Sequence, residues 1–280
     1  MLDWLLDPLA YGFMQRGLLA SVMVGLLCSV VGCYVVLRGM AYLGDAIAHA
    51  VLPGVAVSYL LGADLTLGAM VAAFGVAAGI GWLSRQGKLR EDTAIGIVFA
   101  ASLALGVVLI STIRTYAQDL THILFGNVLG VDEADLWLAG ILGCGVLAVV
   151  VVFYRELMLI SFDPVFAATL RIPTERFRVL LLMLLAATVV VSMQVVGVGL
   201  VTAMLVTPGA TAYLLVRRLP QMMLLAALIG MGSNVVGLYL SFYVNVASGA
   251  AMVLTATSLF LLVFLFAPKH GQVWQWLSHR

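Results

Sequence analysis

The chain has 280 residues, of which 64% are hydrophobic and 10% charged, and its mean hydropathy is +1.15. About a quarter of the residues in a soluble domain are charged, so this composition excludes a soluble globular protein and indicates an integral membrane protein. The net charge of +1 favours no class of partner, and the 3 cysteines lack a CxxC spacing, which argues against a disulfide framework or a zinc cluster.

Stretches of about 20 apolar residues, the length that crosses a bilayer, follow one another along the chain. Nine such spans fit best, and eight is the alternative. The sixth and seventh are joined almost without a loop near 195–200. We therefore predict an all-α, polytopic transmembrane helical bundle in a single domain over residues 1–280. The predicted spans lie near 17–37, 42–61, 66–84, 93–111, 134–153, 177–196, 198–216, 221–243 and 249–267.

The basic residues predict how the bundle is oriented. Lys and Arg are retained on the cytoplasmic side of short loops. When the nine spans alternate in direction, all of the 14 basic residues except Arg16 and Arg114 fall on one face. We therefore expect the amino end outside and the carboxyl end in the cytoplasm.

Asp45 and His49 lie four residues apart in the second span, which also contains Pro53. A helix would put both side chains on one face, where a carboxylate and an imidazole can share a divalent cation. A carboxylate in hydrocarbon costs at least ~2.5–3.5 kcal/mol, so Asp45 should face a cavity or a counter-charge. A mixed oxygen and nitrogen set suits manganese, iron or zinc better than magnesium or calcium. In the alternative interpretation, Asp45 caps the helix and His49 bonds a neighbouring helix; spacing alone leaves both open.

Two extramembrane segments also carry candidate residues. In the outer segment after the fourth span, Asp119 and His122 could receive a metal ion, or could belong to a solvated loop or a protein interface. In the cytoplasmic segment 154–176, Asp163 and Pro164 predict the start of a short helix, because aspartate caps free amides and proline suits the first turn. Pro173 ends that helix. This short helix is either a surface connection or a docking helix for a cytoplasmic partner.

Catalytic signatures are missing from the sequence. It contains no GxxxxGK[ST] loop for binding phosphates, no HExxH and no GxSxG. We therefore expect a non-catalytic subunit whose energy comes from a partner that binds and hydrolyses ATP.

Several motifs together resemble the membrane permeases of bacterial ABC importers for manganese, zinc and iron. The similarity covers most of the chain and is most specific around Asp45 and His49. The motifs are Leu37-Arg38-Gly39-Met40-Ala41, Gly44-Asp45-Ala46, His49-Ala50-Val51-Leu52-Pro53-Gly54, Arg90-Glu91-Asp92-Thr93-Ala94-Ile95-Gly96-Ile97, Asp119-Leu120-Thr121-His122-Ile123-Leu124-Phe125-Gly126-Asn127, Val196-Gly197-Val198-Gly199-Leu200-Val201, Thr207-Pro208-Gly209-Ala210-Thr211-Ala212 and Ala267-Pro268-Lys269-His270-Gly271.

The resemblance implies a fold like that of type II ABC importers and a bacterial cytoplasmic membrane protein. It implies a homodimer or paired permease, two cytoplasmic ATPase subunits that bind ATP, and an external metal-binding protein. The cargo would be a divalent transition metal, with manganese favoured by the 119–127 segment and zinc or iron as alternatives. The resemblance also favours Asp45 and His49 as a metal site. It implies that no cofactor is bound permanently.

The resemblance also assigns ATPase docking to the short cytoplasmic helix. In such permeases the sequence of this cytoplasmic segment resembles Phe-Asp-Pro-Glu-x-Ala followed by a glycine. Here Val165 replaces the acid and Arg171 replaces the glycine. The docking residues implied are Phe162, Asp163, Pro164, Phe166 and Ala167. Two rival functions are a proton-coupled secondary metal transporter and an ABC permease for a chelate such as a siderophore or cobalamin.

Overall fold

The structure is a computed structural model that describes residues 7–85, 91–112 and 128–266. Within these ranges it contains helices and no strands, and nine helices are long and apolar enough to cross a membrane. They are α2 (Gly12–Leu37), α3 (Ala41–Leu61), α4 (Leu65–Arg85), α5 (Glu91–Ser111), α7 (Glu133–Val152), α10 (Thr174–Val196), α11 (Val198–Leu215), α12 (Leu219–Val244) and α13 (Ser248–Phe266). The predicted all-α bundle and its nine spans are confirmed.

Four short helices complete the described chain. The 3-10 helices η1 (Asp7–Ala10) and η2 (Val128–Gly130) precede α2 and α7, and two α-helices follow α7. These two are α8 (Tyr154–Phe162) and α9 (Pro164–Thr169). The sequence analysis predicted α9 but not α8.

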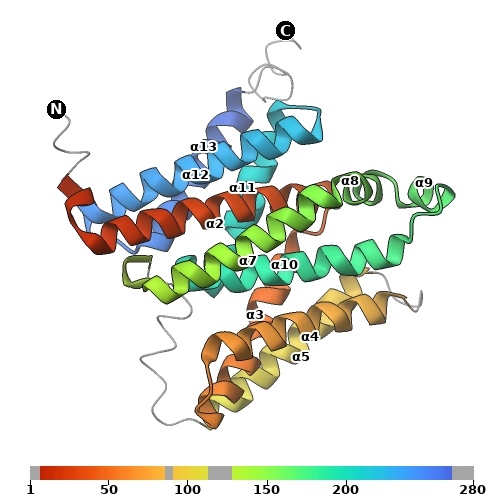
Figure 1. Ribbon diagram of the computed structural model, residues 1–280, viewed down its shortest axis with the longest axis horizontal. Coiled ribbons are helices and arrows are strands. Elements are labelled where there is room, and N and C mark those ends of the chain that lie inside the picture. Colours follow the sequence, from red (N-terminus) through yellow and green to blue (C-terminus); the bar gives the residue numbers. More distant parts are fainter. Residues whose placement is uncertain (1–6, 86–90, 113–127, 267–280) are drawn as a thin grey trace.

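The spans form a bundle whose centre is built on α2 and α10. Most residues of these two helices are buried, whereas α5, α7 and α13 expose most of their surface. Figure 1 shows α2 beside α12 and α10 beside α4, with α13 packed against α12. The exposed faces carry apolar side chains such as Leu105, Leu254 and Leu262, as expected for surfaces covered by lipid or by another subunit.

Two helices cross the direction that the others share. Figure 1 shows α3 and α11 running obliquely between the layers formed by α2, α10 and α4. Each has an interior proline, Pro53 in α3 and Pro208 in α11, and yet each continues through it. They pack closely, because a Cβ added to Gly44 would lie 3.7 Å from Oγ1 of Thr202. The predicted near-absence of a loop before α11 is confirmed, because Gly197 alone joins α10 to α11, at a φ of 89° that favours glycine.

Small residues allow α3 and α4 to approach each other. A Cβ added to Gly54 would overlap the Gly68 carbonyl, and one added to Gly68 would overlap the Ser58 side chain. Gly75 and Gly79 form a GxxxG pattern, which favours close helix approach within or between subunits. A Cβ at either position meets no atom of the described chain within 4 Å. The glycines that set the distance between α3 and α4 are therefore Gly54 and Gly68.

Replacing Gly68 by leucine is expected to destabilise the permease by at least ~1–3 kcal/mol, because α3 and α4 would have to separate. Thermal unfolding of the purified full-length chain in detergent measures the effect. Gly75→Leu is the matched control on the same helix and should unfold close to the wild-type temperature. Equal losses in both variants would contradict the assignment.

Candidate functional site

Asp45 and His49 lie side by side in the first half of α3. His49 Nδ1 is 3.3 Å from Asp45 Oδ1 and 3.0 Å from the Asp45 backbone oxygen. Both side chains are partly accessible in the single chain, Asp45 at 40% and His49 at 23%. The predicted shared face is confirmed, and the pair lies near the end of the bundle where α2 turns into α3.

The capping alternative for Asp45 does not hold. Met40 occupies the N-cap position of α3, and Asp45 lies a full turn inside the helix. The ring of His49 bonds within its own helix and makes an edge contact with Phe99 of α5, with ring centroids 5.5 Å apart. Among the described residues, the pair is therefore not explained by a cap or by an interhelical hydrogen bond from His49.

The hydrogen bond at Nδ1 determines which nitrogen of His49 can bind a metal ion. A backbone carbonyl only accepts hydrogen bonds, so in the neutral imidazole Nδ1 must carry the proton that it donates to Asp45. The lone pair then belongs to Nε2. A histidine that donates one ring N–H to an oxygen and offers its other nitrogen is the usual arrangement at metal sites.

Pro53 interrupts the backbone hydrogen bonding of the helix that carries the pair. A proline has no N–H, so the carbonyl of His49, four positions earlier, lacks the donor that a helix normally supplies to it. Gly106 of α5 packs on this part of α3, since a Cβ there would lie 3.2 Å from Pro53 Cδ.

A cavity of about 240 Å³ lies beside Asp45, between the start of α3 and α5. Phe99 and Asp92 of α5 line it, together with Gly39 and Met40 of the turn before α3. Asp92 belongs to the 90–97 motif, and it lines the same cavity as Asp45. No group of three or more His, Cys, Asp or Glu side chains with metal-binding geometry occurs in the parts of the chain that the structure describes. The described residues of one chain therefore do not form a complete metal site.

Helix α9 begins where its sequence predicts, but the prediction that Pro173 ends it is wrong, because the helix already ends at Thr169. The Asp163 side chain accepts a hydrogen bond of 2.9 Å from the Phe166 N–H, and Pro164 is the first helical residue. At the other end Ile172 N–H bonds Ala167 O and Arg171 N–H bonds Ala168 O, the pattern of a Schellman motif. Figure 1 shows α8 and α9 extending past the ends of the neighbouring spans.

The outer surface where α8 meets α9 carries three exposed apolar side chains. Phe162, Val165 and Phe166 are 58%, 75% and 51% exposed, while Ala167 is buried against the bundle. Exposed apolar groups on a helix outside the spans are typical of a protein contact.

Comparison with known sequences identifies the family. The chain matches the ABC 3 transport family over residues 10–267. The chain belongs to this family.

Relatives and a solved structure agree with membership of the ABC 3 family. A manganese transport system membrane protein, MntC, from Halalkalibacterium halodurans is 49% identical over 263 residues, 94% of this chain and 90% of the relative. A Haemophilus influenzae relative whose name refers to iron transport is 39% identical over 267 residues, 95% of this chain and 98% of that one. The structure of PsaBC from Streptococcus pneumoniae in complex with Fab superposes with a TM-score of 0.87 at 40% identity, covering 100% of this chain and 99% of that chain. The type II importer-like fold is therefore confirmed.

The backbone at Arg171 is strained. Arg171 has a φ of 59°, in the left-handed region that favours glycine, and the resemblance stated in the sequence analysis implies a glycine at this position. A side chain in this region costs about 1–2 kcal/mol relative to glycine. The departure from the pattern is thus a local strain at the end of α9 and leaves the helix itself intact.

Replacing Arg171 by glycine is expected to stabilise the end of α9 by about 1 kcal/mol. Hydrogen exchange of the Arg171 and Ile172 amides should then slow about fivefold, as ~1 kcal/mol implies. Arg176→Gly removes the same charge from the first turn of α10, and should speed local exchange instead. Faster exchange in Arg171→Gly would contradict this account.

The second predicted acid and imidazole pair cannot be placed. Asp119 and His122 lie outside the described residues, as do Lys88 and Arg90 of the basic cluster and the 267–271 motif.

Proposed function

We propose that this chain is the transmembrane permease subunit of an ATP-driven ABC importer that moves Mn²⁺ across the bacterial cytoplasmic membrane. The observation that carries the proposal is the Asp45 and His49 pair beside a cavity, in a chain 49% identical to a manganese transport protein. The chain itself performs no covalent chemistry, and a partner subunit hydrolyses ATP.

Two chains would complete the metal site. One chain supplies a carboxylate and one imidazole nitrogen, which are too few ligands for stable coordination. A second permease copy placed with its α3 facing the first would bring two carboxylates and two imidazoles to one ion. Water would fill the remaining positions. Such a site binds weakly enough to release its ion, which transport requires.

The remaining partners follow from the same assembly. ATPase subunits would dock on α9 with Phe162, Asp163, Pro164, Phe166 and Ala167. A metal-binding protein would deliver the ion on the opposite face, where Asp119 and His122 are candidates for contact. The charge pattern favours the amino end outside and the carboxyl end in the cytoplasm. ATP binding and hydrolysis would open the pathway to one side at a time.

Manganese is preferred over zinc and iron because the more similar of the two relatives is the manganese protein, 49% against 39% identical. The ligand chemistry of Asp45 and His49 is compatible with all three metals. Magnesium and calcium are disfavoured, since both prefer oxygen ligands alone.

Uptake into proteoliposomes tests the proposed function against its rivals. Vesicles that contain the permease and its ATPase should take up radioactive Mn²⁺ from the metal-loaded binding protein only when ATP is present on the ATPase side. Uptake driven by a proton gradient without the ATPase would instead identify a secondary transporter. Competition by a siderophore or cobalamin, but not by free Zn²⁺ or Fe²⁺, would identify a chelate permease.

Replacing Asp92 by asparagine is expected to slow Mn²⁺ uptake several-fold without abolishing it. Asp92 lines the cavity beside Asp45, so its charge should lower the barrier for an ion that leaves the pair. Initial uptake rates at equal permease levels measure the effect. Asp64→Asn is the control, because Asp64 caps α4 through the Leu67 N–H, and an asparagine can still accept this bond. Equal rates for Asp92→Asn and wild type would remove Asp92 from the pathway.

A further inference from the structure

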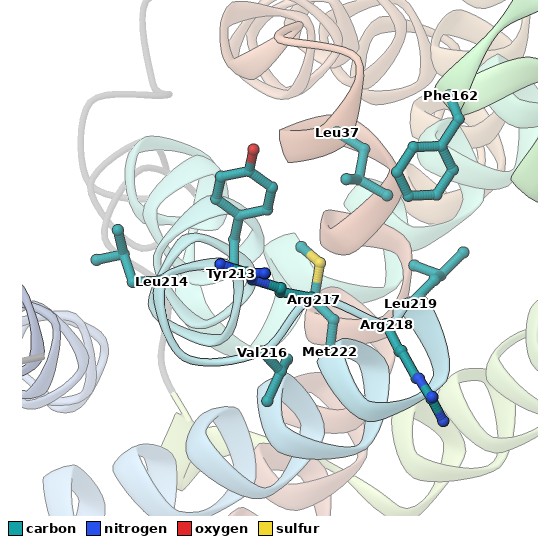
Figure 2. A pocket seen from close by; sticks show the side chains of 9 residues that line it. All are labelled: Leu37, Phe162, Tyr213, Leu214, Val216, Arg217, Arg218, Leu219 and Met222. Carbon is teal, nitrogen blue, oxygen red and sulfur yellow. The ribbon is translucent and has the colours of Figure 1, made fainter. Parts of the chain in front are cut away.

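A second cavity, of about 410 Å³, lies away from the Asp45 site at the end of the bundle that carries α8 and α9. Figure 2 shows that its walls come from four helix ends: Leu37 ends α2, Phe162 ends α8, Tyr213 is near the end of α11, and Leu219 and Met222 begin α12. Of its lining residues, only Phe162 has a role in the proposed transport assembly. Its size is in the range of ligand sites, roughly 300–1,000 Å³.

The cavity combines positive charge with apolar walls. Arg217 and Arg218 form part of the link between α11 and α12, and both are exposed. Figure 2 shows Arg217 on the Tyr213 side and Arg218 on the Leu219 side, so positive charge flanks the mouth. Neither guanidinium group has a hydrogen bond or ion pair with any described residue, and none of the described residues that line the cavity is acidic. An occupant should therefore have an anionic group and an apolar body.

The position of the cavity relative to the spans indicates where that occupant comes from. Leu37 is the last residue of α2, Leu215 the last of α11 and Leu219 the first of α12. The ends of spans lie at the depth of lipid headgroups, where arginine and tyrosine are favoured. The surface next to the cavity stays apolar towards the bilayer, with Leu215 and Leu224 exposed.

We propose that this cavity binds an anionic phospholipid. Arg217 and Arg218, one on each side of the cavity, attract its headgroup, and an acyl chain lies against Leu37, Leu219 and Met222. Basic pockets between transmembrane helices are recognised sites for anionic headgroups. A peptide segment of the ATPase is disfavoured as the occupant, because Phe162 is the one proposed docking residue among the described residues that line the cavity, and the others lie beyond it at Asp163 and on α9. A bound lipid would join the ends of α2, α8, α11 and α12.

Lipid titration of the purified full-length chain, without metal or nucleotide, tests this site separately from transport. Native mass spectrometry counts bound phosphatidylglycerol, with phosphatidylcholine as the neutral comparison. In Arg217→Gln/Arg218→Gln, phosphatidylglycerol affinity should fall roughly 10- to 30-fold. The control Arg155→Gln/Arg176→Gln removes two exposed arginines that do not line the cavity, and it should keep wild-type affinity. Leu37→Trp, which keeps both charges and fills part of the cavity, should also weaken binding.

Three results would overturn the proposal. Equal losses in both double variants would show attraction to overall positive charge rather than a site. Unchanged binding in Leu37→Trp would show that no acyl chain enters the cavity. Unchanged lipid binding in Arg217→Gln/Arg218→Gln, with loss of ATPase co-purification, would assign the cavity to the ATPase instead.

Discussion

Replacing Asp45 by asparagine or His49 by glutamine is expected to abolish Mn²⁺ uptake while leaving the permease in the membrane. Each change keeps the size of the side chain approximately and removes one ligand from a site where a single chain offers very few. Loss of residues that merely support metal ligands costs 10- to 100-fold, so loss of a ligand should lower uptake by at least ~100-fold.

The measurement is the initial rate of radioactive Mn²⁺ uptake by cells that carry the complete transporter, corrected for the permease level in the membrane. Asp64→Asn again provides a carboxylate-to-amide change outside the cavity. Wild-type rates in Asp45→Asn and His49→Gln would remove the pair from the transport pathway.

Replacing Phe166 by aspartate is expected to disconnect the permease from its ATPase. Phe166 is an exposed aromatic residue on α9, and truncation of an aromatic anchor at an interface commonly costs 2 kcal/mol or more, about 30-fold in affinity. A buried charge in its place should cost at least as much. Co-purification of the ATPase with the tagged permease and ATP-driven uptake should both be lost.

Val165→Glu is the matched control for Phe166→Asp. It adds the same charge at the neighbouring exposed position, where the permeases that this chain resembles carry an acid. ATPase association should therefore persist in Val165→Glu. If both variants retain the ATPase, α9 is only a surface connection. If both lose it, any negative charge on α9 is sufficient to prevent ATPase binding, and Phe166 is not an anchor.

The spans could be predicted because a bilayer demands about 20 apolar residues per crossing. Their ends could not, because hydropathy detects the apolar part of a helix while backbone hydrogen bonding continues into the interface. Thus α2 includes Gln15 and Arg16, and α10 starts at Thr174 ahead of Glu175 and Arg176. Helix α8 was missed because it follows α7 after Phe153 alone and is too short for a span.

Local chemistry in the candidate site was predictable, whereas its surroundings were not. The i, i+4 spacing fixed Asp45 beside His49, and Asp163 before Pro164 fixed the start of α9. Asp92 joined the site only through the packing of α5 on α3, which no local pattern encodes. The GxxxG of α4 likewise does not indicate which neighbour it meets, because a close approach depends on which face of the helix packs and against what. The strain at Arg171 could be recognised only from its φ angle.

Pulsed electron paramagnetic resonance of Mn²⁺ bound to the nucleotide-free permease–ATPase complex tests the central claim most directly. The proposed site would place one imidazole nitrogen per chain on the ion, so the wild-type spectrum should show hyperfine coupling to ¹⁴N. In His49→Gln this coupling should disappear, while in His122→Gln it should remain. A nitrogen coupling that persists unchanged in His49→Gln would show that manganese binds elsewhere and would contradict the account.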